Sequence, residues 1–470
     1  MTGHTWTLLL ILAAAIAALI TLINSRLRFH PFVALMLVSI GVALAAGEST
    51  GEIAESVEEG AGGILGDVGV TLAFGAMLGR LLANSGATDR IARTIVDRAG
   101  ERSLPWYMAA ASFVIGIPMF FEIGLIVLLP LIFSVAQRLR HSPKIKGSPY
   151  VYLATPAIAA LCTLHGMVPP HPGPLIGVEG LGADLGTTIL VGLVCAVPTV
   201  VISGPLYGRW IAPRLAVYPD DELVGQFTQG DAAPSGSSAG ADASEAAPKG
   251  VPVGWALTAL MVPVVLMLLR TIGELSLGES SPTRHVLDFL GEPVIAMFAG
   301  FLFALFVLGY RSGMSSDRVR ESLTDSIKSI ASIILIIAGG GAFKQVLEDS
   351  GIGEAIETAA SGAHLNLLVL GWLLALVLSF STGSATVGIV AATGILAPMT
   401  GGGGGVESSL LVVAIGAGSI GLNYVNHAGF WLVKESFGMT LGQATKSHTM
   451  IQTLVSVCGL LMTLLISLFV

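Results

Sequence analysis

Long apolar segments recur from one end of this chain to the other, and they constrain its fold more than any other feature. Each has about 20 mostly apolar residues, the length that an α-helix needs to cross the hydrocarbon core of a bilayer. Charged side chains make up 11% of the 470 residues, against about 25% in ordinary soluble domains. The sequence therefore predicts an all-α polytopic membrane protein, and its composition excludes a string of soluble domains.

The apolar segments fall into two halves that share one order. Each half has three spans, then two short arms, one interrupted helix and a last span. The arms are short for a crossing, which predicts re-entrant hairpins. The first half has spans at 5–25, 30–47, 62–82 and 185–210, arms at 105–117 and 121–136, and an interrupted helix at 150–174. The second half has spans at 252–270, 291–310, 328–348 and 447–468, arms at 364–379 and 385–399, and an interrupted helix at 408–436.

This arrangement predicts an inverted-topology repeat with about 10 transmembrane helices, two re-entrant hairpins and two broken helices. Each half crosses the membrane an odd number of times, so the second copy enters upside down. A short echo supports the repeat: Gly75 to Gly86 and Gly340 to Gly351 both end in Ser-Gly.

Charge gives the orientation. With the N-terminus outside, all lysines and arginines except Arg270, Arg284 and Lys344 fall on one side, and the positive-inside rule makes that side cytoplasmic. The acidic segments 48–59 and 348–357 fall on the other side. We predict a multi-pass protein of the cell (inner) membrane with both termini outside. Lys344 lies within a span, and we expect it to pair with Glu348 one turn later.

A polar segment separates the two repeats. Residues 212–250 are rich in Gly, Ser, Pro and acidic residues, a composition that cannot bury a core and predicts a disordered cytoplasmic linker. The domains are then 1–211 and 251–470. We expect scaffold helices at 5–47, 185–210, 252–310 and 447–468, and a hairpin with a broken helix at 62–175 and at 328–436.

The interrupted helix of the first repeat predicts a binding site. Residues 161–175 read LCTLHGMVPPHPGPL, and each proline removes a backbone donor and clashes with the preceding helical turn. Inside a bilayer such backbone is tolerated only where protein or water covers it, and secondary transporters hold substrates at such breaks. His165, Pro169 and His171 are the predicted substrate-binding residues. The alternative is a proline-rich turn between two spans.

The second interrupted helix breaks near NYVNHAG, residues 423–429. Asn423, Asn426 and Gly429 could offer neutral donors and acceptors to a substrate. His427 could titrate near neutral pH or donate to an anion, and we predict it to be a proton-coupling residue. The alternative for each histidine is a structural hydrogen bond.

The hairpin tips add two further groups. Ser381, Thr382, Gly383 and Ser384 open the second arm of their hairpin, and free amides and hydroxyls at a helix N-terminus favour an anion. Alternatively, Ser and Thr bond carbonyls of their own helix. Glu122 is the acidic residue of the other tip, and an ionisable group at membrane depth is expensive and functional by default. We predict that Glu122 couples protons to transport, with a capping carboxylate as the alternative.

Nothing in the sequence indicates an enzyme, a cofactor or a nucleic-acid partner. The HExxH motif of zinc proteases is absent. Cys162, Cys195 and Cys458 lie in separate apolar helices, without the spacing of a disulfide framework or a metal site.

Four motifs resemble the gluconate permease family of the ion transporter superfamily: HGMVPPHPGP at 165–174, IPMFFEIG at 117–124, STGSATV at 381–387 and GFWLVKESFG at 429–438. The resemblance implies an elevator-type homodimer that imports gluconate or a related sugar-acid anion with protons. It implies a site at Glu122, His165, Pro169, Ser381, Thr382, Ser384, Asn426, Gly429 and Phe430.

Alternatives remain within this resemblance. The family pattern has Asp where this chain has His427, which leaves open the coupling residue and the substrate. A sodium-coupled carboxylate symporter would use the same fold, with Ser, Thr and carbonyl oxygens binding the ion, and some relatives carry D-serine.

Overall fold

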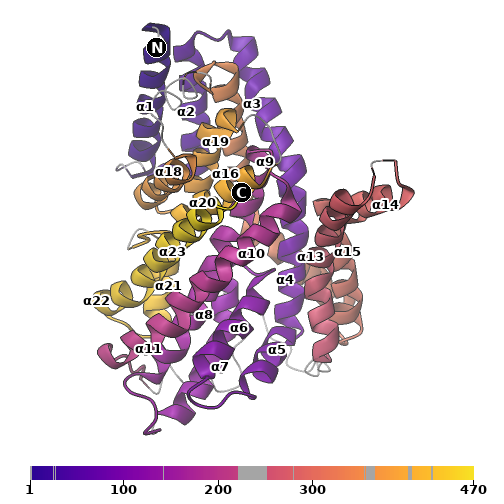
Figure 1. Cartoon of the computed structure of the whole chain (residues 1–470), viewed down its shortest axis with the longest axis vertical. Helices are drawn as coiled ribbons and strands as arrows, with labels where there is room; N and C mark the ends of the chain where they lie inside the picture. The colour runs from indigo at the N-terminus through magenta and orange to yellow at the C-terminus, as the bar shows by residue number, and fades with distance from the viewer. Residues whose placement is uncertain are drawn as a thin grey trace.

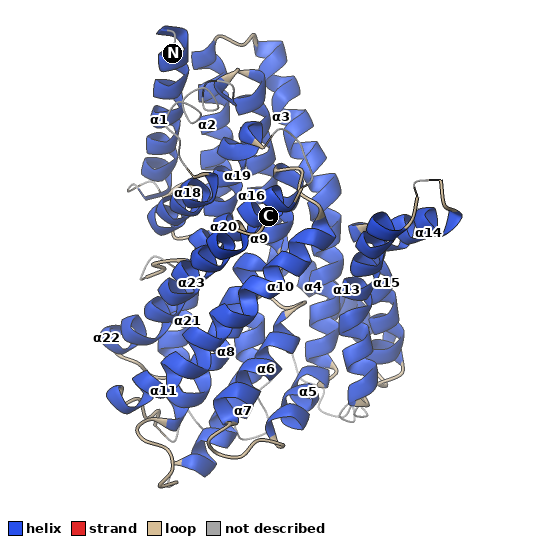
Figure 2. Ribbon diagram, in the orientation of Figure 1, coloured by secondary structure: helices blue, strands red, loops and turns tan. Residues whose placement is uncertain are grey.

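The structure is a computed structural model that describes residues 3–220 and 251–470, apart from 25, 27, 141, 279, 354, 356–365, 401–404, 425 and 426. Within those residues every regular element is a helix and there is no strand (Figure 2). The predicted all-α fold is confirmed. Most of the predicted linker, residues 221–250, lies outside the described residues, and residues 212–214 at its start form a short 3-10 helix.

The helices of the first half follow the predicted order. They are α1 Gly3–Asn24, α2 Pro31–Ala46, α3 Thr50–Ile64, η1 Leu65–Gly69, α4 Val70–Asn84, α5 Ala87–Val96, α6 Leu104–Gly116, α7 Phe121–Leu139, α8 Pro149–Met167, α9 Pro172–Gly180, α10 Leu185–Val201, η2 Ile202–Leu206, α11 Tyr207–Ile211 and η3 Ala212–Arg214. The elements η1 and η2 are π-helical turns inside longer helices.

The second half repeats this order, with α16 in the place of α3 to α4. Its helices are α13 Val253–Ser276, α14 Pro282–Gly291, α15 Pro293–Ala304, η4 Leu305–Tyr310, α16 Ser316–Asp349, α18 Leu367–Thr382, α19 Ala385–Leu396, η5 Ala397–Met399, α20 Val406–Ile420, α21 Ala428–Ser436, α22 Leu441–Ala444, η6 Thr445–Thr449 and α23 Met450–Ile466. Figure 1 shows α1 and α2 at the upper end, α13 to α15 at the right edge and α5 to α7 at the lower end.

The described part of the chain has 8 helices that are long and apolar enough to cross a membrane. Shorter apolar helices include α6, α18, α19 and α20. The arm expected at 121–136 continues to Leu139, because Gln137 and Arg138 extend the last turn, where a positive charge interacts favourably with the helix dipole.

Three regions expected to lie between spans are helical. Residues 50–64, inside the acidic segment 48–59 and beyond, form α3, which runs through η1 into α4. Ser49 and Glu52 start it with a capping box, which satisfies two backbone donors. The basic segment 84–103 contains α5, and α14 occupies 282–291. Polar surface helices of this kind lack the apolar length on which the span prediction depended.

The ends of the two long helices have the same local structure. Ser85 and Ser350 cap α4 and α16, and each side chain donates to a carbonyl three residues earlier, at 3.1 and 3.4 Å. Gly86 and Gly351 follow with φ of 68° and 71°, the left-handed region that glycine enters at low cost. The echo in the sequence therefore corresponds to one capping geometry that occurs twice.

Helix packing also repeats between the halves. α6 packs on α8 and α18 packs on α20, while α7 contacts α21 and α19 contacts α9. The helices α6, α7, α8 and α9 of the first half correspond in order to α18, α19, α20 and α21 of the second. Each contact above therefore has a counterpart that is also present. α8 and α20 contact each other, so the two interrupted helices form the centre of this arrangement.

Candidate functional site

The two helix breaks meet at a glycine contact. A Cβ atom added to Gly166 on α8 would lie 2.7 Å from the carbonyl oxygen of Gly416 on α20, and one added to Gly416 would clash with the carbonyl oxygen of Gly166. Small residues allow two helix backbones to approach this closely. The crossing lies just before both breaks, so it holds the two interrupted segments against each other inside the protein.

The first break has two histidines with different surroundings. Every residue of α8 except His165 is buried, and the Nδ1 atom of His165 has no hydrogen-bond partner among the described residues. His171 directly precedes α9, and its Nε2 atom lies 2.8 Å from the carbonyl oxygen of Gly116. The rings are 5.7 Å apart. His171 therefore ties the break to the end of α6, while His165 remains free to meet a ligand.

Glu122 lies in the first turn of α7, at the tip of the first hairpin, and is half-buried. Its carboxyl group interacts electrostatically with His165 on α8 and with His427 at the start of α21. The structure thus brings together both predicted proton-coupling residues and one predicted substrate-binding residue, from three different segments. Pro169, in the same break, is buried.

His427 and Gly429 begin α21. The Nδ1 atom of His427 accepts a hydrogen bond from the Gly429 N–H at 3.3 Å, as the oxygen of a capping Asp would. His427 therefore serves as the helix cap of α21. A Cβ atom on Gly429 would lie 3.1 Å from the Phe121 ring, so this glycine lets α21 approach the first hairpin. Asn426 lies outside the described residues.

The tip of the second hairpin is half-buried over residues 381–384. Gly383 ends α18 with φ of 71°, and the Ser384 hydroxyl accepts from the Val387 N–H at 3.4 Å to cap α19. The Thr382 hydroxyl donates to the Leu378 carbonyl at 2.7 Å, which is the alternative anticipated for these hydroxyls. Ser381 also has an interaction partner. No described contact joins this tip to Glu122.

Asn423 connects the second break to the second hairpin. It is 1% exposed, and the hydroxyl of Ser379 donates to the Ser419 carbonyl at 2.5 Å and lies 3.4 Å from the Asn423 Oδ1 atom. The Nδ2 atom of Asn423 has no partner among the described residues. The NH2 group of an amide has two N–H donors, and leaving them buried without an acceptor is costly. An oxygen atom of a substrate could accept a hydrogen bond from this group.

The last helix also contributes to the site, although the sequence prediction placed it in the scaffold. His448, Gln452 and Ser456 are buried, at 0%, 2% and 1% exposure, and they face the broken helices. Gln452 Nε2 lies 3.5 Å from Cys162 Sγ, and the Thr449 hydroxyl donates to the Asn423 carbonyl at 2.8 Å. Their spacing of four residues in an apolar span is the signal that could have identified them.

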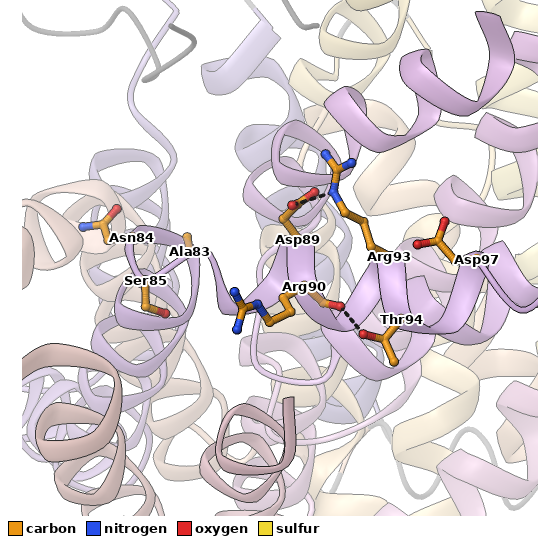
Figure 3. A pocket seen from close by; sticks show the side chains of 9 residues that line it. Ala83, Asn84, Ser85, Asp89, Arg90, Arg93, Thr94 and Asp97 are labelled. Carbon is orange, nitrogen blue, oxygen red and sulfur yellow. Dashed lines mark hydrogen bonds and ion pairs between the residues drawn. The ribbon is translucent and has the colours of Figure 1, made fainter. Parts of the chain in front are cut away.

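A surface cavity of about 540 Å³ lies away from this site, where α4 meets α5. Figure 3 shows Asp89 paired with Arg93 at 2.8 Å and the Thr94 hydroxyl bonded to the Arg90 carbonyl. The charged groups of this cavity are thus of both signs and partly paired. The described residues contain no group of three or more His, Cys, Asp and Glu that could hold a metal ion.

Comparison with known proteins identifies the family of this chain. Residues 6–469 match the GntP family permease family. The chain belongs to this family. It is a multi-pass membrane transporter, and membership in a family of permeases agrees with the expectation that it is not an enzyme.

Several characterised GntP relatives are similar over nearly their whole length. A gluconate permease of Pseudomonas aeruginosa is 40% identical, covering 99% of both chains. The high-affinity gluconate transporter of Escherichia coli is 37% identical, covering 98% of this chain and 100% of that one. The D-serine transporter DsdX of Escherichia coli is 33% identical, covering 99% of both.

A solved structure is similar to this GntP member in fold. It is the YdaH transporter of Alcanivorax borkumensis, whose topology is described as unusual. The TM-score is 0.60 at 18% identity, and the match covers 93% of this chain and 97% of that one.

Proposed function

We propose that this GntP family transporter imports gluconate or a related sugar-acid anion together with protons. The observation that carries the proposal is the electrostatic interaction of Glu122 with His165 and His427, which belong to helix breaks from opposite halves of the chain. Relatives at 37–40% identity are named for gluconate, which supports the substrate class.

The site offers both chemistries that such a cycle needs. Among the described residues, the Asn423 Nδ2 and His165 Nδ1 atoms are buried without a hydrogen-bond partner, and they can pair with the hydroxyl and carboxylate groups of a sugar acid. A carboxyl group beside two imidazoles can exchange protons. A monoanion that enters with one proton moves no net charge, so a pH gradient alone can drive its accumulation.

We further propose that the two halves are inverted repeats and that hairpins and broken helices move together against the remaining helices. The repeated packing pattern and the repeated cap at Ser85 and Ser350 support the repeat. A homodimer, as the family resemblance implies, would hold the remaining helices fixed in the membrane.

Tryptophans paired with basic residues support a cytoplasmic position for the linker side. Indole rings concentrate at membrane interfaces, and Lys and Arg concentrate on the cytoplasmic side. Each pair described here belongs to a segment predicted to end on that side. The pairs are Arg209 with Trp106, Arg214 with Trp210, Arg311 with Trp255 and Lys434 with Trp431.

The test is uptake of labelled gluconate into proteoliposomes. An inward proton gradient in sodium-free buffer should drive accumulation, and collapsing the gradient should abolish it. Uptake that ignores the proton gradient but follows a sodium gradient would instead support a sodium-coupled carboxylate carrier. D-serine, the substrate in one relative's name, serves as the competing substrate, and accumulation of D-serine without gluconate would overturn the proposed substrate class.

A further inference from the structure

His448 is a buried titratable residue that has no role in the proposed transport cycle. It is 0% exposed, and both of its ring nitrogens are without a hydrogen-bond partner among the described residues. Buried polar groups in proteins almost always have a partner, so an orphaned imidazole requires an explanation. Within a membrane span, an ionisable side chain is a functional candidate by default.

The ring lies beside the two motifs that build the site. Its centroid is 5.7 Å from that of Phe121, the residue before Glu122, and 6.3 Å from that of Phe430, the residue after Gly429. His448 also interacts electrostatically with His427. One side of the imidazole therefore lies toward His427, which itself interacts with Glu122.

The other side leads toward the surface. His448 belongs to the π-helical turn Thr445–Thr449 between α22 and α23, and such turns occur frequently at functional sites. Lys446, two residues earlier, is exposed, whereas Ser447 and His448 are buried. The turn thus passes from solvent on the linker side to the site within a few residues.

Few other titratable groups compete for this position. Beyond the site residues, those on the segments around the turn are two buried thiols, an ion pair of 2.7 Å, four phenols and the exposed lysine: Cys162, Cys458, Lys434 with Glu435, Tyr150, Tyr152, Tyr207, Tyr424 and Lys446. His448 is the buried imidazole that lies between the site and this surface.

We propose that His448 is a proton-transfer residue that carries protons between the site and the solvent on the linker side. A neutral imidazole has one free and one protonated nitrogen. It accepts a proton at the free nitrogen from the side of His427 and releases the other proton toward the surface, so that the ring returns to neutrality. This inference rests on the proposed proton symport and adds a residue to it.

His448→Gln keeps a polar side chain but cannot titrate. We expect uptake driven by a pH gradient to fall by about 100-fold, the lower range for proton transfer by a positioned side chain. Counterflow of labelled gluconate, which exchanges substrate without net proton release, should be retained. Thr453→Val is the matched control, because the Thr453 hydroxyl bonds the Thr449 carbonyl within the same helix, and it should leave both activities unchanged.

Two results would overturn the inference while the proposed function stands. Undiminished accumulation in His448→Gln would show that no proton passes through this ring. Loss of both counterflow and gluconate binding in His448→Gln and in a second variant, His448→Asn, would show a structural or substrate-contacting role. A wild-type protein that does not accumulate gluconate under a pH gradient would instead overturn the proposed function, and this inference with it.

Discussion

At the scale of single residues, the contact between Gly166 and Gly416 positions the site. Each glycine approaches the backbone of the other helix so closely that no side chain fits between them. In a bilayer, van der Waals packing contributes more to helix association than it does in water, because lipid tails are as apolar as the helices. These two residues therefore determine how close the two breaks lie.

Gly416→Ala should destabilise the protein by about 1–3 kcal/mol, the usual cost of overpacking. Gly62→Ala on α3, where an added Cβ meets nothing within 4 Å, is the matched control and should be neutral or slightly stabilising. Thermal unfolding of the two purified variants measures the difference. Equal midpoints would contradict the close crossing of α8 and α20.

Glu122→Gln tests the carboxyl group at the first tip. Since an amide cannot exchange protons, we expect accumulation of gluconate to be abolished while the protein still inserts and folds. Glu55→Gln, at an exposed carboxylate on α3, should accumulate gluconate normally. Full concentrative uptake by Glu122→Gln in proteoliposomes would remove this residue from the mechanism.

At the scale of helices, the sequence predicted where the backbone is interrupted better than where it continues. The positions of the prolines predicted the break between α8 and α9. The short apolar arms predicted the helices α6, α7, α18 and α19. The expected pairing of Lys344 with Glu348 is confirmed at 3.6 Å. Such features depend on local chemistry, which a single sequence records.

The unpredicted features depend on tertiary packing. The continuation of α3 into α4 follows an acidic stretch that is polar enough to be a loop, and only its packing against α16 makes it one long helix. The polar face of α23 was likewise hidden, because its average composition is apolar. The positions of Ser381 to Ser384 relative to Glu122 could not be deduced from spacing either.

Glu48, between α2 and α3, should make the stability of the protein depend on pH. Burial, together with repulsion by Asp349 and Glu52, raises the pKa of Glu48 above its usual 4.5. A raised carboxyl pKa contributes stability that is fully present below the unfolded value and is lost as the pH rises through the folded value. Glu48→Gln should therefore raise the melting temperature at pH 7 but not near pH 4. An equal shift at both pH values would contradict this origin.

At the scale of the whole molecule, two hydrophobic cores surround the site. One includes the first hairpin and α8, and the other includes the second hairpin, α16 and much of α20. The second break touches both: Asn423 lies 3.4 Å from Ser379 beside one hairpin, and Gly429 packs against Phe121 of the other. The site is thus shared by the two halves of the chain.

The linker between the halves should be dispensable for transport. Its composition predicts no packed structure, and residues 221–250 lie outside the described residues. Deletion of Gly230 to Pro248 should leave gluconate uptake unchanged, because the remaining residues can still connect the halves. Loss of transport at normal expression in membranes would show that this segment does more than connect them.

The double attachment of the second break has a consequence for leakage. A carrier must never expose its cargo to both compartments at once, since an open pore would dissipate the gradient that drives it. Because one short segment contacts both hairpins, displacement of either hairpin strains the contact with the other. Such a coupling would keep the two hairpins moving together, so that neither opens a continuous path by itself, without any additional element to synchronise them.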